Sequence, residues 1–150
     1  MKYRKAVFVV AYARKNNSVE YLLLKRKLHW KGWEFPKGKI EKGEKKIETA
    51  KRELQEETGH TILRIKDFHF SGKYNYRRIL PDRPKIKGQT FSLFAAEISR
   101  QGKVSLDRKE HNGFKWVSFK TAMKMLKWKD QKKSLKIVNE WLEEKSHKAR

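Results

Sequence analysis

Three glutamates lie close together within one short segment of the chain. Glu53, Glu56 and Glu57 are spaced i, i+3 and i+4, so on a helix their carboxylates share one face. Like charges at this spacing destabilise an isolated helix by roughly 0.2–0.5 kcal/mol per pair. A divalent cation would offset that repulsion, because Mg²⁺ prefers carboxylate oxygens and takes its other ligands from water and substrate phosphate. The helix alone leaves open an ordinary solvated face, with Lys51 and Arg52 as ionic partners.

The residues around the glutamates form a longer motif. Gly38 is followed after five residues by Glu44, and after seven more by the run RELQEETG at residues 52–59. This spacing resembles the signature of the Nudix hydrolase family. One position departs, because the family usually has an aliphatic residue where this chain has His60. We expect Ile62 to fill the core position that His60 leaves.

The resemblance implies roles for individual residues. Mg²⁺, for which Mn²⁺ can substitute, would be bound and its water activated by Glu53, Glu56 and Glu57, with the general base left open among them. Gly38 would offer its backbone carbonyl to the metal. Arg52 and Glu44 would form an ion pair that orients the glutamates. The implied reaction is attack of a metal-activated water on a phosphorus of a nucleoside diphosphate linkage.

A further carboxylate comes later in the chain. Glu110 opens the run EHNGFKW at residues 110–116, which is similar to the element that often supplies an additional catalytic carboxylate in this family. A plain loop glutamate is the alternative. The neighbouring His111 is a weaker candidate than Glu110.

Two segments bear on the substrate. The run WEFPKG at residues 33–38 is more similar to the diadenosine tetraphosphate hydrolases than to Nudix proteins with two glycines after the proline, and Lys37 would then touch substrate phosphate. The run KYNYRR at residues 73–78 adds side chains that can stack a base or bind polyphosphate: Tyr74, Tyr76, Arg77 and Arg78. Strand packing for the tyrosines and a solvated edge for the arginines are the alternatives. Trp30 is another residue that can stack a base.

The resemblance favours a dinucleoside polyphosphate such as diadenosine tetraphosphate as substrate. RNA 5′ pyrophosphohydrolases share the Trp-x-Phe-Pro start and are the main competing interpretation, together with a nucleoside triphosphate pyrophosphatase. A non-catalytic, basic nucleic-acid-binding module on a Nudix scaffold is the alternative from another class. The intact set of glutamates argues against it, because a binding module gains nothing from three mutually repelling carboxylates.

Composition sets wider bounds. The 150 residues predict a single domain over 1–150, and the absence of cysteine excludes disulfides and thiolate-bound metals. Lys and Arg number 39 against 17 Asp and Glu, a net charge of +22 that favours anionic partners such as nucleotides or RNA. Adaptation to salt or heat would also enrich lysine. No apolar run approaches the ~20 residues of a membrane span, so we expect a cytoplasmic protein without membrane contact.

The elements that must position these residues follow from periodicity. Strands are predicted at residues 3–12, 19–25, 62–76, 89–98 and 114–119, with a turn at Asn16 and Asn17 and an exposed loop at 81–84. Helices are predicted at residues 45–58, 120–128 and 131–145, after a non-helical stretch at 29–43. On the first helix, Ile47, Ala50 and Leu54 form one apolar stripe, and Gly59 supplies the stop. The expected fold is an α/β/α sandwich around a mixed sheet, with frayed last residues.

Overall fold

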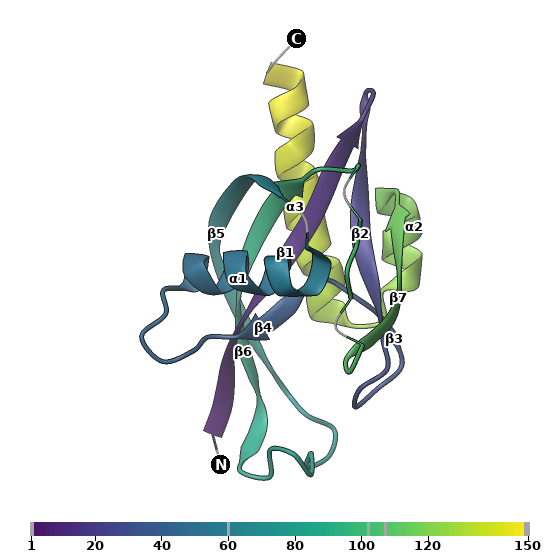
Figure 1. The fold of residues 1–150 in the computed structure, drawn as a ribbon. Helices are drawn as coiled ribbons and strands as arrows, with labels where there is room; N and C mark the ends of the chain where they lie inside the picture. Colours follow the sequence, from purple (N-terminus) through teal and green to yellow (C-terminus); the bar gives the residue numbers. More distant parts are fainter. Residues whose placement is uncertain (1, 60, 102, 107, 149–150) are drawn as a thin grey trace.

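The strands pair into one mixed sheet (Figure 1). The structure is a computed structural model that describes residues 2–59, 61–101, 103–106 and 108–148. The strands are β1 (Lys2–Lys15), β2 (Ser18–Arg26), β3 (Gly32–Glu34), β4 (Lys37–Lys39), β5 (Ile62–Asn75), β6 (Ile86–Ile98) and β7 (His111–Val117). Their order is β3-β2-β1-β6-β5, with β4 paired to β1 and β7 paired to β2. β1 runs parallel to β6, and the other pairs are antiparallel.

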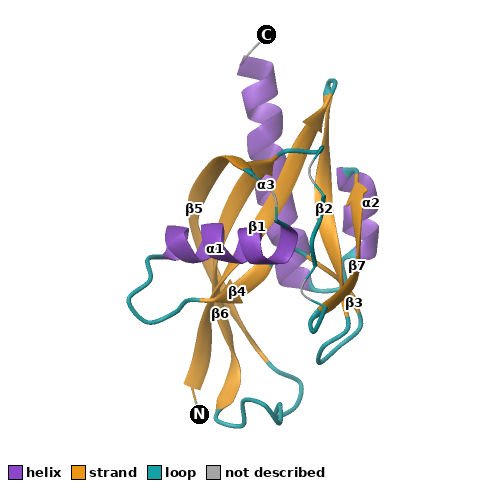
Figure 2. Ribbon diagram, viewed as in Figure 1, coloured by secondary structure: helices purple, strands orange, loops and turns teal. Residues whose placement is uncertain are grey.

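Helices cover both faces of this sheet, as the sequence predicts (Figure 2). They are α1 (Lys46–Thr58), α2 (Phe119–Met125) and α3 (Lys129–Lys148). Alternate residues of a strand point to opposite faces, so β1 contributes to two cores. Val7 and Val9 pack with Leu54 of α1. Phe8 and Val10 pack on the other face, in the core to which α3 contributes Leu135, Val138 and Leu142. The architecture is the expected α/β/α sandwich with a mixed sheet.

The helix that carries the three glutamates is held at both ends. The backbone N–H of Lys45 donates to Glu48 at 3.0 Å, and Gly59 ends the helix with a left-handed φ of 68°. Leu54 is buried, but Ile47 is 38% exposed, so the predicted apolar stripe is wrong in the first turn. Ile62 packs against the core that contains Leu54, as expected. His60 and the residues 149–150, where fraying was predicted, lie outside the described residues.

Two of the predicted elements near the end of the chain have boundaries that differ in a way that affects the site. The strand predicted at residues 114–119 spans His111–Val117, because Ser118 accepts a hydrogen bond from the Thr121 N–H at 3.2 Å and starts α2. The helix predicted at 120–128 ends at Met125, and Leu126 forms a parallel bridge to Trp33. Trp128 therefore lies in the connection to α3. Within the non-helical stretch 29–43, β3 and β4 pair with β2 and β1. No helix of the described ranges is long and apolar enough to cross a membrane.

Candidate active site

The contact between β4 and α1 brings Gly38 against Glu53. Gly38 pairs with Val7 of β1, on the sheet face that α1 covers. A Cβ added at Gly38 would overlap the carboxyl group of Glu53. Only glycine therefore leaves room for the Glu53 carboxylate beside the β4 backbone.

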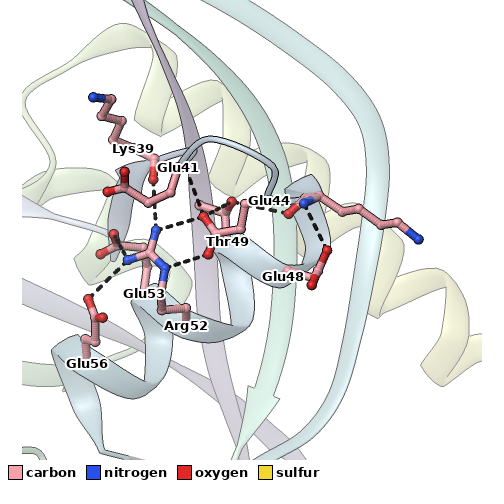
Figure 3. Close-up of polar contacts among 9 residues, drawn as sticks. Lys39, Glu41, Glu44, Glu48, Thr49, Arg52, Glu53 and Glu56 are labelled. Atoms are coloured by element: carbon pink, nitrogen blue, oxygen red, sulfur yellow. Dashed lines mark hydrogen bonds and ion pairs between the residues drawn. The ribbon is translucent and has the colours of Figure 1, made fainter.

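Arg52 ties the loop before α1 to two of the glutamates (Figure 3). Its Nε and Nη2 donate to the two carboxylate oxygens of Glu44 at 2.6 and 3.0 Å. Its Nη1 donates to Glu53 at 2.8 Å and to Glu56 at 3.3 Å, and Nη2 also donates to the carbonyl of Lys39 at 3.0 Å. Hydrogen bonds from Arg52 lower the pKa of Glu44 to about 2. One guanidinium thus fixes the loop and the helix side chains together.

The three helix glutamates lie in different environments. The Glu56 side chain is 57% exposed, whereas that of Glu53 is 14% exposed and Glu57 is buried. Burial raises the pKa of Glu53 to about 7, against the opposing effect of Arg52. Burial, together with the nearby carboxylates of Glu34, Glu53 and Glu110, raises the pKa of Glu57 well above its usual value. The exposure of the three carboxylates on this face therefore decreases from Glu56, through Glu53, to the buried Glu57.

Glu110 and His111 reach the buried end of this face from β7 and the loop before it. Glu57, Glu110 and His111 each offer an atom able to bind a metal, and these atoms lie within 4.8 Å of one another. Among the described residues, no hydrogen-bond partner reaches Oε2 of Glu57, which is a buried acceptor. An unpaired buried carboxylate oxygen is costly, and a divalent cation would satisfy it. The oxygen donors and the cradle at Gly38 therefore fit a divalent metal.

A buried ionic cluster behind Glu57 was not predicted from the sequence. Oε2 of Glu34 accepts from Arg26 at 3.0 Å and lies 2.7 Å from Nε2 of His111. Oε1 lies 3.3 Å from Nζ of Lys37. Burial alone would raise the pKa of Glu34, but Lys37, His111 and Arg26 outweigh it and hold the value at about 2. The sequence contains one indication of this cluster, since Glu34 lies between the aromatic residues Trp33 and Phe35.

A cavity of about 560 Å³ opens on the other side of this cluster. Lys37 pairs with Phe8, whose ring belongs to the α3-side core, so Lys37 and Gly38 point to opposite faces of β4. Lys37 lines the cavity together with the other predicted substrate-binding residues, Tyr74, Tyr76, Arg77 and Arg78. Arg26 also lines it, so the ionic cluster separates the carboxylates from the cavity.

Aromatic rings form much of the cavity wall. Tyr74 and Tyr76 lie edge to face with ring centroids 6.2 Å apart, and Trp30 and Trp128 do the same at 5.4 Å. The Arg77 guanidinium lies 5.0 Å from the Trp128 ring. Trp128 was not predicted as a site residue, because the sequence placed it at the end of the helix predicted at 120–128. The feature of the sequence that could have identified Trp128 is its position between two predicted helices, where a large aromatic side chain can face a cavity.

Known proteins with similar sequences or structures include nucleotide hydrolases. Residues 2–138 match the family model for the NUDIX domain. The chain is 31% identical over 129 residues to the bis(5′-nucleosyl)-tetraphosphatase (asymmetrical) of Sus scrofa, covering 85% of this chain and 83% of that protein. It is 33% identical over 106 residues to an RNA pyrophosphohydrolase of a Nitratiruptor species, covering 68% of each. A crystal structure of a C. elegans Ap4A hydrolase binary complex has the same fold, with a TM-score of 0.75 at 24% identity over 93% of this chain and 97% of that chain.

Proposed function

The chain belongs to the Nudix family and is a pyrophosphohydrolase, and on this premise we propose that it cleaves dinucleoside polyphosphates such as diadenosine tetraphosphate. The observation that carries the proposal is the cavity on the other side of the ionic cluster from the carboxylates, whose wall contains both aromatic rings and cations. The rings are those of Trp30, Tyr74, Tyr76 and Trp128. The cations include Arg4, Arg26, Lys37, Arg77, Arg78 and Arg83. Rings can stack nucleobases, and guanidinium and ammonium groups bind phosphate oxygens.

We propose that Mg²⁺, or Mn²⁺ in its place, is held by Glu53, Glu56 and Glu57 with the carbonyl of Gly38. Nudix hydrolases generally use a divalent metal, and the donor set here consists of the oxygens that Mg²⁺ prefers. When bound, such an ion neutralises phosphate charge and lowers the pKa of its water. Arg52, through its bonds to Glu44, holds Glu53 and Glu56 in position. Glu110, half-buried beside Glu57, is a further candidate to accept the proton of the attacking water.

Lys37 has a defined part in this proposal. Lys37 lines the cavity, while the next residue, Gly38, lies against Glu53 on the other face of β4. A phosphate chain that runs from the cavity to the carboxylates would pass β4, and Lys37 is a cation on that path. Its pairing with Glu34 at 3.3 Å limits the positions that the ammonium group can take.

A direct test compares three substrates under one set of conditions. The purified protein is given diadenosine tetraphosphate, ATP or 5′-triphosphorylated RNA, with Mg²⁺, Mn²⁺ or a chelator, and products are identified by mass spectrometry. We expect the highest kcat/KM with diadenosine tetraphosphate and no turnover with the chelator. Turnover that persists in the chelator would contradict the metal assignment.

The second candidate is an RNA 5′ pyrophosphohydrolase. The similarity to the Nitratiruptor protein favours it, as does the net charge of +22. A higher kcat/KM on the triphosphorylated RNA would select this function, whereas a preference for ATP would select a nucleoside triphosphate pyrophosphatase. RNA binding without hydrolysis of any of the three substrates would select the non-catalytic binding module.

A further inference from the structure

One end of the sheet projects beyond the elements that form the candidate active site. The start of β1, the end of β5 and the start of β6 extend past β4 (Figure 1). In this region Tyr3 of β1 pairs with Gly88 of β6, and Gly88 pairs with Asn75 of β5. Tyr3 alternates along β1 with Val7, which packs on the α1 side of the sheet. The Tyr3 side chain therefore lies on the opposite face of the sheet from the cavity.

Two exposed lysines lie beside the ring of Tyr3. Nζ of Lys73 is 5.1 Å from the ring centroid, and Nζ of Lys87 is 4.9 Å from it. Lys87 is an extra residue of β6, because the register of β1 and β6 shifts between Lys2 and Tyr3. Such a bulge changes the direction of a side chain. Lysines from two different strands thus meet at one aromatic ring.

The Tyr3 ring is held against the sheet. Its hydroxyl donates to Oδ1 of Asn75 at 2.7 Å. A Cβ added at Gly88 would come within 2.9 Å of Cε1 of Tyr3, so the ring lies close to the β6 backbone at this glycine. A ring fixed in this way can stack a planar group with little further loss of side-chain freedom.

Positive charge predominates in the segments that meet at this end of the sheet. Residues 2–5, 73–78 and 83–88 have the sequences KYRK, KYNYRR and RPKIKG, which contain no Asp or Glu. Asp82, next to the third segment, already forms an ion pair with Arg83 at 3.6 Å. Repulsion among clustered cations is unfavourable, and a polyanion that contacts several of them relieves it.

We propose that the surface formed by Lys2, Tyr3, Lys5, Lys73 and Lys87 binds a single strand of nucleic acid, with phosphates at the lysines and an unpaired base stacked on Tyr3. Lysines that follow the phosphates beside an aromatic ring are the general arrangement of proteins that bind unpaired nucleic acid. A base inside a duplex has no free face to offer to the ring. The surface should therefore prefer a single strand to a duplex.

The composition of this surface favours nucleic acid over a lipid membrane. Binding at a membrane surface depends on apolar area that enters the lipid as well as on charge. Among the residues that the structure describes, the large apolar side chains that are exposed are those of Ile47, Leu63, Ile79 and Phe114. All four lie outside the proposed surface.

This surface goes beyond the proposed function, because it is separate from the cavity. Arg4, which follows Tyr3 and points to the opposite face of β1, lines the cavity. Nucleic acid can therefore be bound at Tyr3 whether or not its end is hydrolysed at the carboxylates.

Fluorescence anisotropy with a labelled single-stranded oligoribonucleotide tests the lysines, with chelator present to prevent metal-dependent hydrolysis. We expect Lys73→Gln with Lys87→Gln to weaken binding at least about tenfold at low salt, and to reduce the salt slope by about 0.7 for each lysine that contacts phosphate. Lys15→Gln with Lys124→Gln is the matched control, since it removes two exposed charges from the other end of β1 and from α2. Equal losses in the two pairs would overturn the proposal, because net charge alone would then determine binding.

Variants of Tyr3 test the stacking. Tyr3→Leu should weaken binding of the single strand at least about fivefold and leave the affinity for duplex RNA of the same length unchanged. Tyr3→Phe keeps the ring and should retain the affinity for the single strand. Circular dichroism checks that each variant is folded. Unchanged affinity for the single strand in folded Tyr3→Leu would also overturn the proposal.

The two proposals fail separately. Hydrolysis of diadenosine tetraphosphate by a protein whose RNA affinity is insensitive to Lys73 and Lys87 would remove the surface and leave the proposed function intact. RNA binding that depends on these lysines and on Tyr3, in a protein that hydrolyses none of the three substrates, would support the surface and contradict the function.

Discussion

Glu53, Glu56 and Glu57 have the same spacing as any glutamates on one helix face, yet each has a distinct chemical environment. Glu56 lies in solvent, Glu53 lies against Gly38 and Arg52, and Glu57 is buried. The gradient arises because α1 lies on the sheet with this face turned partly inward. A cation at its inner end would lie close to β4 and to the loop that carries Glu110.

The first prediction concerns these carboxylates. Glu56→Gln or Glu57→Gln should lower kcat on diadenosine tetraphosphate by orders of magnitude, because each removes a proposed metal ligand and keeps the side-chain shape. The matched control is Glu144→Gln, an exposed position on α3, for which kcat should not change. Steady-state kinetics at saturating Mg²⁺, with circular dichroism of each variant, make the measurement. Full activity in the double substitution would contradict the assignment.

The second prediction concerns Glu53 in the metal-free protein. Its pKa is raised from 4.5 to about 7, so the folded protein holds a proton that the unfolded chain has released. The stability contributed by this group is therefore complete below pH 4.5 and is lost as the pH rises through 7. Glu53→Gln should gain stability relative to wild type, on the order of 2 kcal/mol, as the pH rises from about 5 to about 8. Urea unfolding with chelator present measures this difference, and an equal difference at both pH values would contradict the prediction.

At the scale of elements, the three-residue strand β4 joins the two halves of the site. Its three residues pair with β1. Because successive residues of a strand point to opposite faces of the sheet, Gly38 faces α1 and Lys37 faces the side of the cavity. The carboxylates and the cavity lie on different faces of the sheet, and β4 contacts both. Substitutions in this strand should therefore affect either the metal or the substrate, according to the face.

Gly38→Ala tests the face toward α1. The added Cβ would overlap the Glu53 carboxyl group, which must then move away from β4. We expect kcat to fall by roughly 100-fold, because small displacements of catalytic groups are costly. Gly113→Ala is the control, since its added Cβ would lie 3.6 Å from the nearest atom, in ordinary contact distance. Unchanged kcat in folded Gly38→Ala would show that the close approach is not needed.

Lys37→Ala tests the face toward the cavity. If Lys37 contacts the phosphate chain, its loss should lower kcat/KM more for diadenosine tetraphosphate than for ATP, because the longer chain makes more contacts with the cations of the cavity. One charged hydrogen bond is worth ~1.5–3 kcal/mol, which corresponds to about a 10- to 100-fold loss. Lys124→Ala, an exposed lysine of α2, serves as the control. Equal losses on both substrates would assign Lys37 to the support of Glu34 alone.

At the scale of the whole molecule, the chain carries a net charge of +22, and the cavity is itself lined by cations. Such a field attracts nucleotides and RNA alike, so charge does not select between them. Because both hydrophobic cores lie on one sheet, we propose that residues 1–150 form a single Nudix hydrolase domain.

The surface lysines provide the last prediction. Lys132→Gln with Lys133→Gln removes two positive charges from α3, outside the cavity wall. We expect weaker RNA binding and a shallower dependence of the RNA affinity on salt, by up to about two units of slope if both lysines contact phosphate. The kcat on diadenosine tetraphosphate should not change. Fluorescence anisotropy with labelled RNA at several salt concentrations makes the measurement, and an unaltered salt slope would exclude this helix from RNA contact.

The local spacing of residues in the sequence was enough to predict much of the candidate site. The helix over α1 and its stop at Gly59 follow from short-range periodicity and from the left-handed freedom of glycine. The hairpin of β1 and β2 follows in the same way from Asn16, which has a positive φ of 56°. The layered fold could be predicted because these elements expose apolar residues on defined faces, and the family resemblance adds the identity of the reaction.

Tertiary structure decided the contacts between distant segments. Glu34 and His111 are 77 residues apart and meet at 2.7 Å, since β3 and β7 both pair with β2. No local pattern encodes that register. Trp128 joins Trp30 in the cavity wall only because α2 ends at Met125. The order of the glutamates from solvent to interior likewise depends on how α1 lies on the sheet, which is set by packing of Ala50 and Leu54 against the strands rather than by the spacing of the carboxylates.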